Sequence, residues 1–241
     1  MKSSAFVIKR GALTEYKGNG GEIIIPDGVK SINDFLFEDN YLITKVYIPA
    51  SMEDIGDMAF ACCSAVTNFE VDEGNRFYCS VDGDLYRKYG MELINYAQGK
   101  REKHVTILDG VTSIRNVVFK NCTYLESISI PDSVKSIETS AFRGCTNLKS
   151  ISIPAGVKYL DRWVFLGCSS LSEVILPEGF LYIGESVFGD CTALTDLFIP
   201  DSVDTISYCA FDGCNNLRIH ASRGSYAEEY AQENNIPFIA I

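Results

Sequence analysis

Residues 148–170 read LKSISIPAGVKYLDRWVFLGCSS, and the same 23-residue spacing of Leu, Ile, Pro, Val, Phe and Cys recurs on both sides of them. Seven phenylalanines mark the repeat, at a constant step apart from one longer gap: Phe37, Phe60, Phe119, Phe142, Phe165, Phe188 and Phe211. A cysteine stands three residues after each of the last six: Cys63, Cys122, Cys145, Cys168, Cys191 and Cys214. A fixed period of roughly 20 to 50 residues is the sequence pattern of a solenoid, whose successive coils stack on one another.

The tail of each unit predicts a β-strand, because its apolar residues alternate with polar ones. Ile151 and Ile153 should face the core and Ser150 and Ser152 the solvent, since alternate side chains of a strand lie on opposite faces. Pro154 then ends the strand, because proline has no backbone N–H for the ladder. A coil of 23 residues cannot bury its own apolar face, so we expect stacked coils to form one continuous parallel sheet and one core.

The repeat unit reads P-x-x-V-x-x-I-x-x-x-A-F-x-x-C-x-x-L-x-x-I-x-I and resembles the BspA-like leucine-rich repeat, the 23-residue class with an A-F-x-x-C core. Seven copies cover about two thirds of the chain. The resemblance implies a right-handed leucine-rich-repeat solenoid of the α/β type, mostly β, with a parallel sheet. It also implies a surface or secreted protein of host-associated anaerobes, in a family of which some members are implicated in adhesion to host proteins.

The layout predicts a single domain, 1–241, with a hairpin cap (1–22), first repeats (23–71), an insertion (72–103), five repeats (104–219) and a C-terminal cap (220–241). The insertion carries Asp82-Gly83, a turn signal of β-hairpins, and is expected to form a small β-meander that bulges from the solenoid. Its pattern matches that of the N-terminus at a constant offset of 72 residues, which predicts an N-terminal β-hairpin. Gly20 stands where the repeat has leucine, which fits an incomplete first coil.

The C-terminal cap is predicted to combine a helix with a strand. Ser225 and Glu228 have the spacing of a capping box, which starts a helix. The strand before it, 218–221, is displaced by one residue from the register of the repeats, and 236–241 reads as a last strand. With both ends closed by atypical sequence, we expect the chain to be close to a complete folding unit.

Composition excludes two classes of partner. The formal net charge of −11 and the pI near 4.7 argue against nucleic acid, whose phosphates require clustered Lys and Arg. No apolar run of about 18 residues is present, so we expect no membrane insertion. Residues 1–10 lack the apolar segment of a signal peptide. The resemblance alone therefore predicts a cell-surface or secreted protein, and a cytoplasmic protein is the alternative. We expect a monomer.

The residues that usually carry chemistry offer no site. His104 and His220 lie in no catalytic motif, and Asp82-Gly83-Asp84 lacks the spacing of a calcium loop, which favours a plain turn. Cysteines locked to the repeat favour a ladder of buried, reduced thiols over disulfides or zinc. We therefore predict no catalytic, cofactor-binding or metal-binding residue, no cofactor, and no enzyme.

The outer face of the sheet remains as a candidate surface. At its C-terminal end Ile175 lies beside Phe198 with acidic neighbours, and clustered apolar groups rimmed by charge mark interaction sites; ordinary exposed surface is the alternative. The predicted partner-binding face comprises Tyr47, Glu70, Glu173, Ile175, Asp196 and Phe198. The leading hypothesis is a non-enzymatic module that binds a protein or glycan, with the adhesion to host surface components that the resemblance implies. The alternative is a structural spacer or scaffold with no tight ligand.

Overall fold

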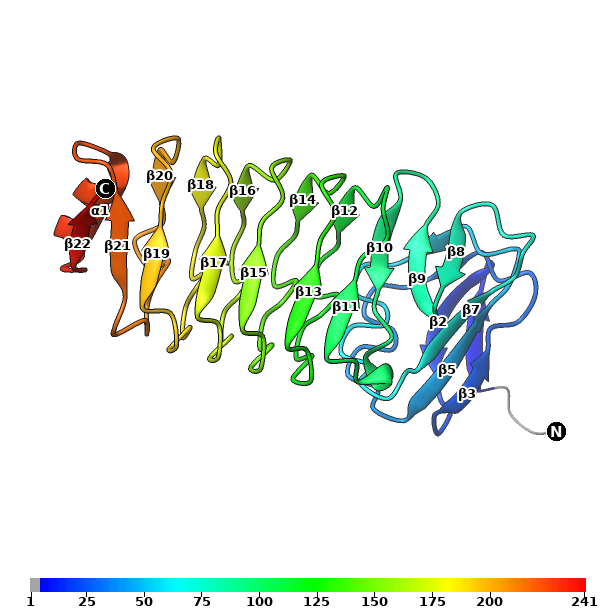
Figure 1. The fold of residues 1–241 in the computed structure, drawn as a ribbon. Helices are drawn as coiled ribbons and strands as arrows, with labels where there is room; N and C mark the ends of the chain where they lie inside the picture. Colours follow the sequence, from blue (N-terminus) through cyan, green and yellow to red (C-terminus); the bar gives the residue numbers. More distant parts are fainter. Residues whose placement is uncertain (1–4) are drawn as a thin grey trace. The chain divides into compact units, whose positions relative to one another are not determined.

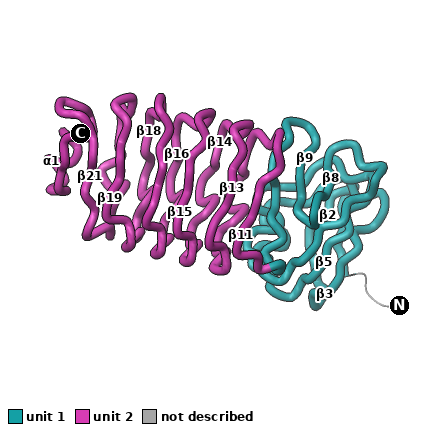
Figure 2. The backbone as a smooth tube through the Cα atoms, viewed as in Figure 1, with its two compact units in different colours: residues 1–100 teal, residues 101–241 magenta. Residues whose placement is uncertain are grey.

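A computed structural model describes residues 5–241 of the chain. Residues 1–4 lie outside the described residues. They are part of the predicted cap 1–22 and of the stretch 1–10 that lacks a signal-peptide segment. The chain forms two compact units, residues 1–100 and residues 101–241 (Figure 2). The single domain and its internal boundaries stay a prediction.

Unit 2 is a parallel solenoid in which each coil contributes short strands (Figure 1). The strands that the sequence predicted form one parallel sheet: β11 (His104–Thr106), β13 (Ser127–Ser129), β15 (Ser150–Ser152) and β17 (Glu173–Ile175). Ser150 pairs with Glu173 and Ile151 with Val174, one repeat apart. Ile151 is buried and Ser152 is exposed, which confirms the predicted alternation.

The prediction of one continuous sheet is wrong, because the strand at 196–198 pairs with 218–221 in a separate sheet from β17. The coils between 104 and 206 also each have a second, two-residue strand that the sequence did not predict. These strands are β12 (Ser113–Ile114), β14 (Ser136–Ile137), β16 (Tyr159–Leu160), β18 (Tyr182–Ile183) and β20 (Thr205–Ile206). The N–H of Val157 donates to the carbonyl of Pro154, and this turn bends the chain before Leu160 enters the core. Apolar residues three apart, such as Val157 and Leu160, lack the period of two that predicts a strand.

Two side-chain ladders fill the core of unit 2. The phenylalanine rings stack with centroid distances of 5.1 Å (Phe119–Phe142), 5.4 Å (Phe142–Phe165), 5.7 Å (Phe165–Phe188) and 5.6 Å (Phe188–Phe211). The thiols of Cys145, Cys168, Cys191 and Cys214 donate at 2.9 to 3.2 Å to the carbonyls of Phe119, Phe142, Phe165 and Phe188. Each buried thiol thus satisfies a backbone carbonyl of a neighbouring coil, which an alanine or valine could not do.

Unit 1 begins with the predicted hairpin. The strands β1 (Phe6–Lys9) and β2 (Ala12–Tyr16) pair antiparallel. In the same sheet β2 pairs in parallel with β4 (Ser31–Ile32), and β4 pairs in parallel with β6 (Asp54–Ile55). A second sheet has the order β3 (Gly21–Ile24), β5 (Ile43–Ile48), β7 (Asn68–Val71). The Tyr16 ring lies 5.3 Å from Phe37, which stacks on Phe60 at 4.9 Å, so the hairpin closes this end of the phenylalanine stack.

The insertion forms the predicted antiparallel meander. Its strands are β8 (Tyr78–Val81), β9 (Asp84–Arg87) and β10 (Glu92–Asn95), followed by a 3-10 turn η1 (Gln98–Lys100). Asp82 and Gly83 both have positive φ, 50° and 82°, as a two-residue type I′ turn requires. Arg10 and Gly11 have φ of 53° and 82°, so the same hairpin recurs at the offset of 72 residues.

The expectation that the meander bulges from the solenoid is wrong. Tyr78 and Leu85 are 1% and 0% exposed and belong to the core cluster of unit 1. The Tyr78 hydroxyl accepts a 2.9 Å hydrogen bond from the backbone N–H of Ile55, so the meander is joined to the coil that precedes it. Its apolar residues have no core of their own, and burial against the coil is what stabilises them.

The C-terminal cap has the predicted helix and strand. α1 (Tyr226–Glu233) has Ser225 as its N-cap, and the Ser225 side chain accepts from Glu228 N. β19 (Asp196–Phe198), β21 (Arg218–Ala221) and β22 (Phe238–Ala240) form a sheet in which Asp196 pairs with Arg218, and this 22-residue step confirms the displaced register. The Tyr230 ring stands edge-on to Phe211 at 5.9 Å and closes the phenylalanine stack.

Candidate binding surfaces

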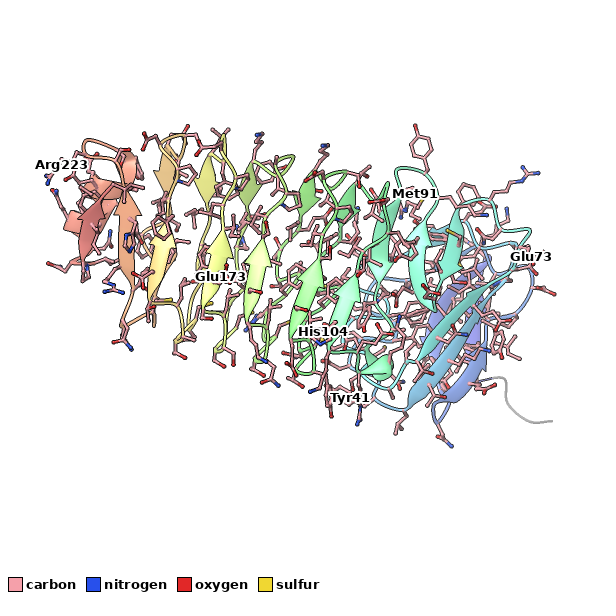
Figure 3. All side chains as sticks on the ribbon, in the orientation of Figure 1. Tyr41, Glu73, Met91, His104, Glu173 and Arg223 are labelled. Carbon is pink, nitrogen blue, oxygen red and sulfur yellow. The ribbon has the colours of Figure 1, made fainter. Side chains whose placement is uncertain are left out.

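The predicted face divides between the two units. Tyr47 and Glu70 lie in unit 1, whereas Glu173, Ile175, Asp196 and Phe198 lie in unit 2. Figure 3 labels Glu173 on its strand β17. Two surfaces follow from this division. The Phe198 patch comprises Glu173, Ile175, Asp196, Phe198, Arg218 and His220. The Tyr47 hollow comprises Ile24, Asp27, Tyr47, Glu70, Asp72 and Glu73.

Two large apolar side chains give the Phe198 patch its character. Ile175 and Phe198 are 53% and 55% exposed, at the ends of the neighbouring strands β17 and β19 (Figure 1). Each stands at an outward strand position, because the residue before it, Val174 or Leu197, is buried in the core. The strand geometry therefore presents both side chains to solvent on the same face.

The Asp196 carboxylate holds the polar side chains of the patch in place by hydrogen bonds. It accepts hydrogen bonds from Arg218 Nη2 at 2.7 Å, His220 Nε2 at 2.8 Å and Thr195 Oγ1 at 2.9 Å. The Arg218 guanidinium, and next the His220 imidazole, hold the pKa of Asp196 well below its usual range. A negative charge and a guanidinium thus lie beside the apolar pair.

His220 supports Phe198 directly. The two rings stack with centroids 4.4 Å apart, and the His220 side chain is only 13% exposed. The predicted face includes neither Arg218 nor His220, and the predicted layout has His220 in the C-terminal cap. The signal that could have found them is the 22-residue step, which puts Arg218 beside Asp196 and His220 beside Phe198 on the paired strand.

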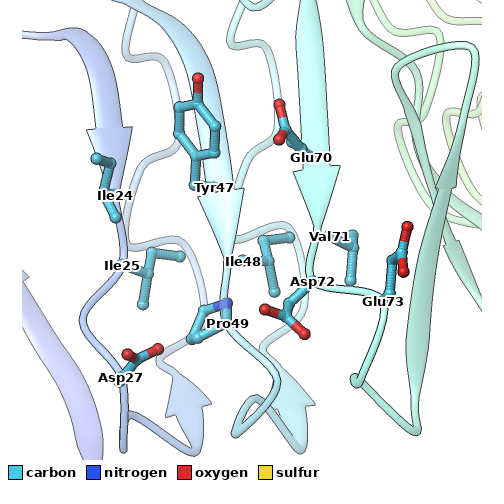
Figure 4. Close-up of a pocket in the computed structure, with 10 residues that line it drawn as sticks. All are labelled: Ile24, Ile25, Asp27, Tyr47, Ile48, Pro49, Glu70, Val71, Asp72 and Glu73. Atoms are coloured by element: carbon cyan, nitrogen blue, oxygen red, sulfur yellow. The ribbon is translucent and has the colours of Figure 1, made fainter.

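The Tyr47 hollow lies at the ends of β3, β5 and β7 (Figure 4). Its volume is about 350 Å³. Ile24, which is 67% exposed, adds an apolar wall beside Tyr47 and Glu70. Ile24 is absent from the predicted face, although it stands two residues before Pro26, at the same outward strand position that Tyr47 has before Pro49.

The hollow has an acidic rim. Asp27, Asp72 and Glu73 line it together with Glu70. Lys45 Nζ lies 2.7 Å from Glu70 Oε2 and 4.3 Å from the centre of the Tyr47 ring. The hydrogen bond to Glu70, and next that to Tyr47, raises the pKa of Lys45 above its ordinary value. The Lys45 ammonium group is thus already held against the Tyr47 ring. The other carboxylates of the rim favour the binding of a further positively charged group.

The other residues considered in the sequence have local partners. His104 Nδ1 lies 2.8 Å from Ser127 Oγ on the exposed face. Asp84 is buried, accepts from Ala97 N at 2.8 Å and pairs with Lys100 Nζ at 3.0 Å, which favours a structural role in the meander. Within residues 5–241, no group of three or more His, Cys, Asp or Glu side chains is placed to hold a metal ion.

The ladder thiols should be unreactive in the folded protein. Burial raises the pKa of Cys63 to about 12 and that of Cys214 to about 11, and thiolate is the reactive form. Cys79 is the one cysteine of the nine that is not fully buried. We expect iodoacetamide at pH 8 to label Cys79 first and the others only after unfolding in denaturant, as read by mass spectrometry of digests.

A Cys79→Ser variant is the control for this labelling, because it should remove the early modification and leave the slow sites unchanged. Rapid labelling of Cys145, Cys168 or Cys191 in the native protein would contradict the buried ladder.

A family model described as the BspA type leucine rich repeat region matches residues 7–80 and 96–218 in six copies. The chain therefore belongs to this family. The sequence pattern counts seven phenylalanine-marked units where the family model counts six. A search of curated proteins gave no match.

Solved structures share the right-handed leucine-rich-repeat solenoid. A leucine-rich repeat protein from Eubacterium ventriosum has a TM-score of 0.57 and 22% identity, with 80% of this chain and 64% of that chain covered. The pneumococcal vaccine antigen PcpA has a TM-score of 0.71 and 18% identity over 92% of this chain and 68% of its own. A T. pallidum leucine-rich repeat protein has a TM-score of 0.51 and 27% identity over 80% and 90%. This chain thus spans less than two thirds of the E. ventriosum protein.

The described part of the chain contains no helix that is both long and apolar enough to cross a membrane.

Proposed function

We propose that this protein is a non-enzymatic binding module. It presents to a protein or a glycan the outer face of the strands that precede each proline position, such as β17 and β19. The observation that carries the proposal is the Phe198 patch, in which Ile175 and Phe198 are each more than half exposed. Membership of a repeat family supports it, because solenoids commonly use an extended face for binding.

The patch has the composition of a binding hot spot. Aromatic and arginine side chains are enriched at such positions, and here Phe198 lies beside Asp196 and its partner Arg218. The stacking of His220 on Phe198 holds the aromatic ring in place. Because the ring and the charges are already ordered, a partner would lose little conformational entropy on contact.

The Tyr47 hollow is a second contact region under the same proposal. Tyr47 and Ile24 offer apolar area, and the carboxylates of Asp27, Asp72 and Glu73 offer acceptors. Sugar hydroxyls or basic side chains are the groups that such a rim would recognise.

Adhesion to host surface components is the finer form of the proposal. It rests on the resemblance to BspA-like proteins, and a structural neighbour described as a vaccine antigen agrees with it. The competing hypothesis is a spacer or scaffold region with no tight ligand, because fold alone does not imply function.

A binding screen against host matrix proteins and glycans tests the proposal, with wild type compared to an Ile175→Asp/Phe198→Asp double variant. We expect the double variant to lose at least tenfold in affinity, since two charges would replace the apolar contact. A Leu181→Asp/Tyr208→Asp variant is the matched control, because both side chains are exposed (43% and 83%) but lie outside the patch.

Equal binding by wild type and the patch variant would show that the patch is not the site. If wild type binds none of the probes, the spacer hypothesis is favoured.

A further inference from the structure

Residues of the meander line a third surface feature, which shares no residue with the Phe198 patch or the Tyr47 hollow. The Arg87 hollow is lined by Glu53, Arg76, Phe77, Tyr78, Arg87 and Tyr89 and has a volume of about 360 Å³. This volume lies at the small end of the range of ligand pockets, roughly 300–1,000 Å³, and suits one ring. All six residues belong to unit 1.

The hollow is basic although the protein is acidic. Arg76 and Arg87 line it, whereas the chain as a whole carries a formal net charge of −11. Its one carboxylate, Glu53, is already paired with Lys30 at 2.9 Å. Charge complementarity therefore favours an anionic ligand at this place.

The Arg87 guanidinium is not committed to a strong fork-shaped contact. Its Nε is buried and forms an ion pair with Glu92 Oε2 at 3.7 Å, which is too long for a hydrogen bond. Its Nη2 donates to the Tyr78 hydroxyl at a long 3.4 Å. A guanidinium gains most from two parallel bonds to one carboxylate, and a bound carboxylate would supply them at Nη1 and Nη2, since Nε is buried.

Tyr78 offers a third donor. Its oxygen accepts hydrogen bonds from Ile55 N and Arg87 Nη2, so both bonds leave the hydroxyl hydrogen for an acceptor. Burial, the largest cause, raises the pKa of Tyr78, which keeps the hydroxyl protonated. The oxygen atoms of an anionic ligand are suitable acceptors.

Two aromatic side chains provide an apolar platform. Phe77 and Tyr89 are 43% and 90% exposed. The backbone of Phe77 is fixed on both sides, because its N–H donates to Asn75 Oδ1 at 2.8 Å and its carbonyl accepts from Lys88 N at 2.7 Å. Rings of this kind pack against the flat C–H face of another ring.

We propose that the Arg87 hollow binds a hexuronic acid residue of an acidic glycan. The carboxylate accepts from Arg76 and Arg87, the C–H face of the sugar lies on Phe77 and Tyr89, and a hydroxyl donates to Glu53. A plain aromatic acid would satisfy the arginines and the platform but would offer Glu53 no donor. The site is independent of the Phe198 patch and the Tyr47 hollow.

Isothermal titration with trigalacturonic acid tests the proposal, against its fully methyl-esterified form and against benzoate. We expect binding of the acid alone, weakened at high salt because the contact is ionic. Arg76→Gln, Arg87→Gln and Tyr89→Ala should each weaken the affinity about tenfold or more. Arg143→Gln and Tyr208→Ala are matched controls on exposed residues of unit 2 and should leave the affinity unchanged.

The proposal would be overturned by no binding of trigalacturonic acid, by equal binding of the methyl ester, or by full affinity in both the Arg76→Gln and Tyr89→Ala variants. These two side chains are exposed or at the rim, so their replacement is not expected to unfold the protein. Equal competition by benzoate would overturn the assignment to a sugar acid.

Discussion

Replacing Phe165 with alanine is expected to lower the free energy of unfolding by about 3–5 kcal/mol. Phe165 is 0% exposed and stacks between Phe142 at 5.4 Å and Phe188 at 5.7 Å. The lost side chain removes apolar burial and leaves a cavity between rings that the neighbouring coils hold in place. Urea unfolding followed by circular dichroism measures the change.

Tyr208→Ala is the control for this measurement, because Tyr208 is 83% exposed and its truncation should change stability by no more than about 0.5 kcal/mol. An unchanged urea midpoint for Phe165→Ala would contradict the stacked core.

Replacing Gly20 with alanine is expected to cost about 2–4 kcal/mol. Gly20 has a φ of +86°, in the region that L-residues rarely adopt, and an added Cβ would overlap Cβ of Leu42 and lie 2.5 Å from its carbonyl carbon and oxygen. The overlap involves backbone of the next coil, which cannot move aside as a flexible side chain can. Unfolding in urea again reports the loss.

Gly28→Ala separates the two causes. Gly28 has nearly the same φ, +84°, but an added Cβ would meet nothing within 4 Å. It should therefore cost only about 1 kcal/mol, the conformational part. Equal losses in the two variants would mean that the contact with Leu42 contributes nothing.

The repeat could be predicted because each coil obeys the same local rules. The strand that contains Ile151, the hairpin and helix of the two caps and the Asp82-Gly83 turn all follow from residue type and spacing. The second strand of each coil could not be predicted, because apolar residues such as Val157 and Leu160 are three residues apart and the strand at Leu160 follows from the turn at Pro154. The meander was misplaced because its sequence does not reveal that Tyr78 bonds to Ile55.

The candidate sites divide in the same way. Ile175 and Phe198 could be named from the sequence, because the strand period alone decides that they face outward. His220 and Arg218 were not named, although the displaced register of 218–221 sets them opposite Phe198 and Asp196. That His220 stacks on Phe198 and Arg218 bonds to Asp196 is visible only in the paired strands β19 and β21. The Arg87 hollow was also beyond the sequence, because the hairpin turn between β9 and β10 carries Tyr89 to the place where Glu53 of an earlier coil lies.

The period of 23 residues by itself determined the class of fold, the buried phenylalanine and cysteine ladders and the direction of the side chains in the strand that precedes each proline position. These properties are local, and a residue's place within its own coil decides them. Tertiary structure alone decided where the meander packs and which groups surround Arg87. These depend on distances between coils and insertions far apart along the chain, and a one-dimensional pattern does not contain such distances.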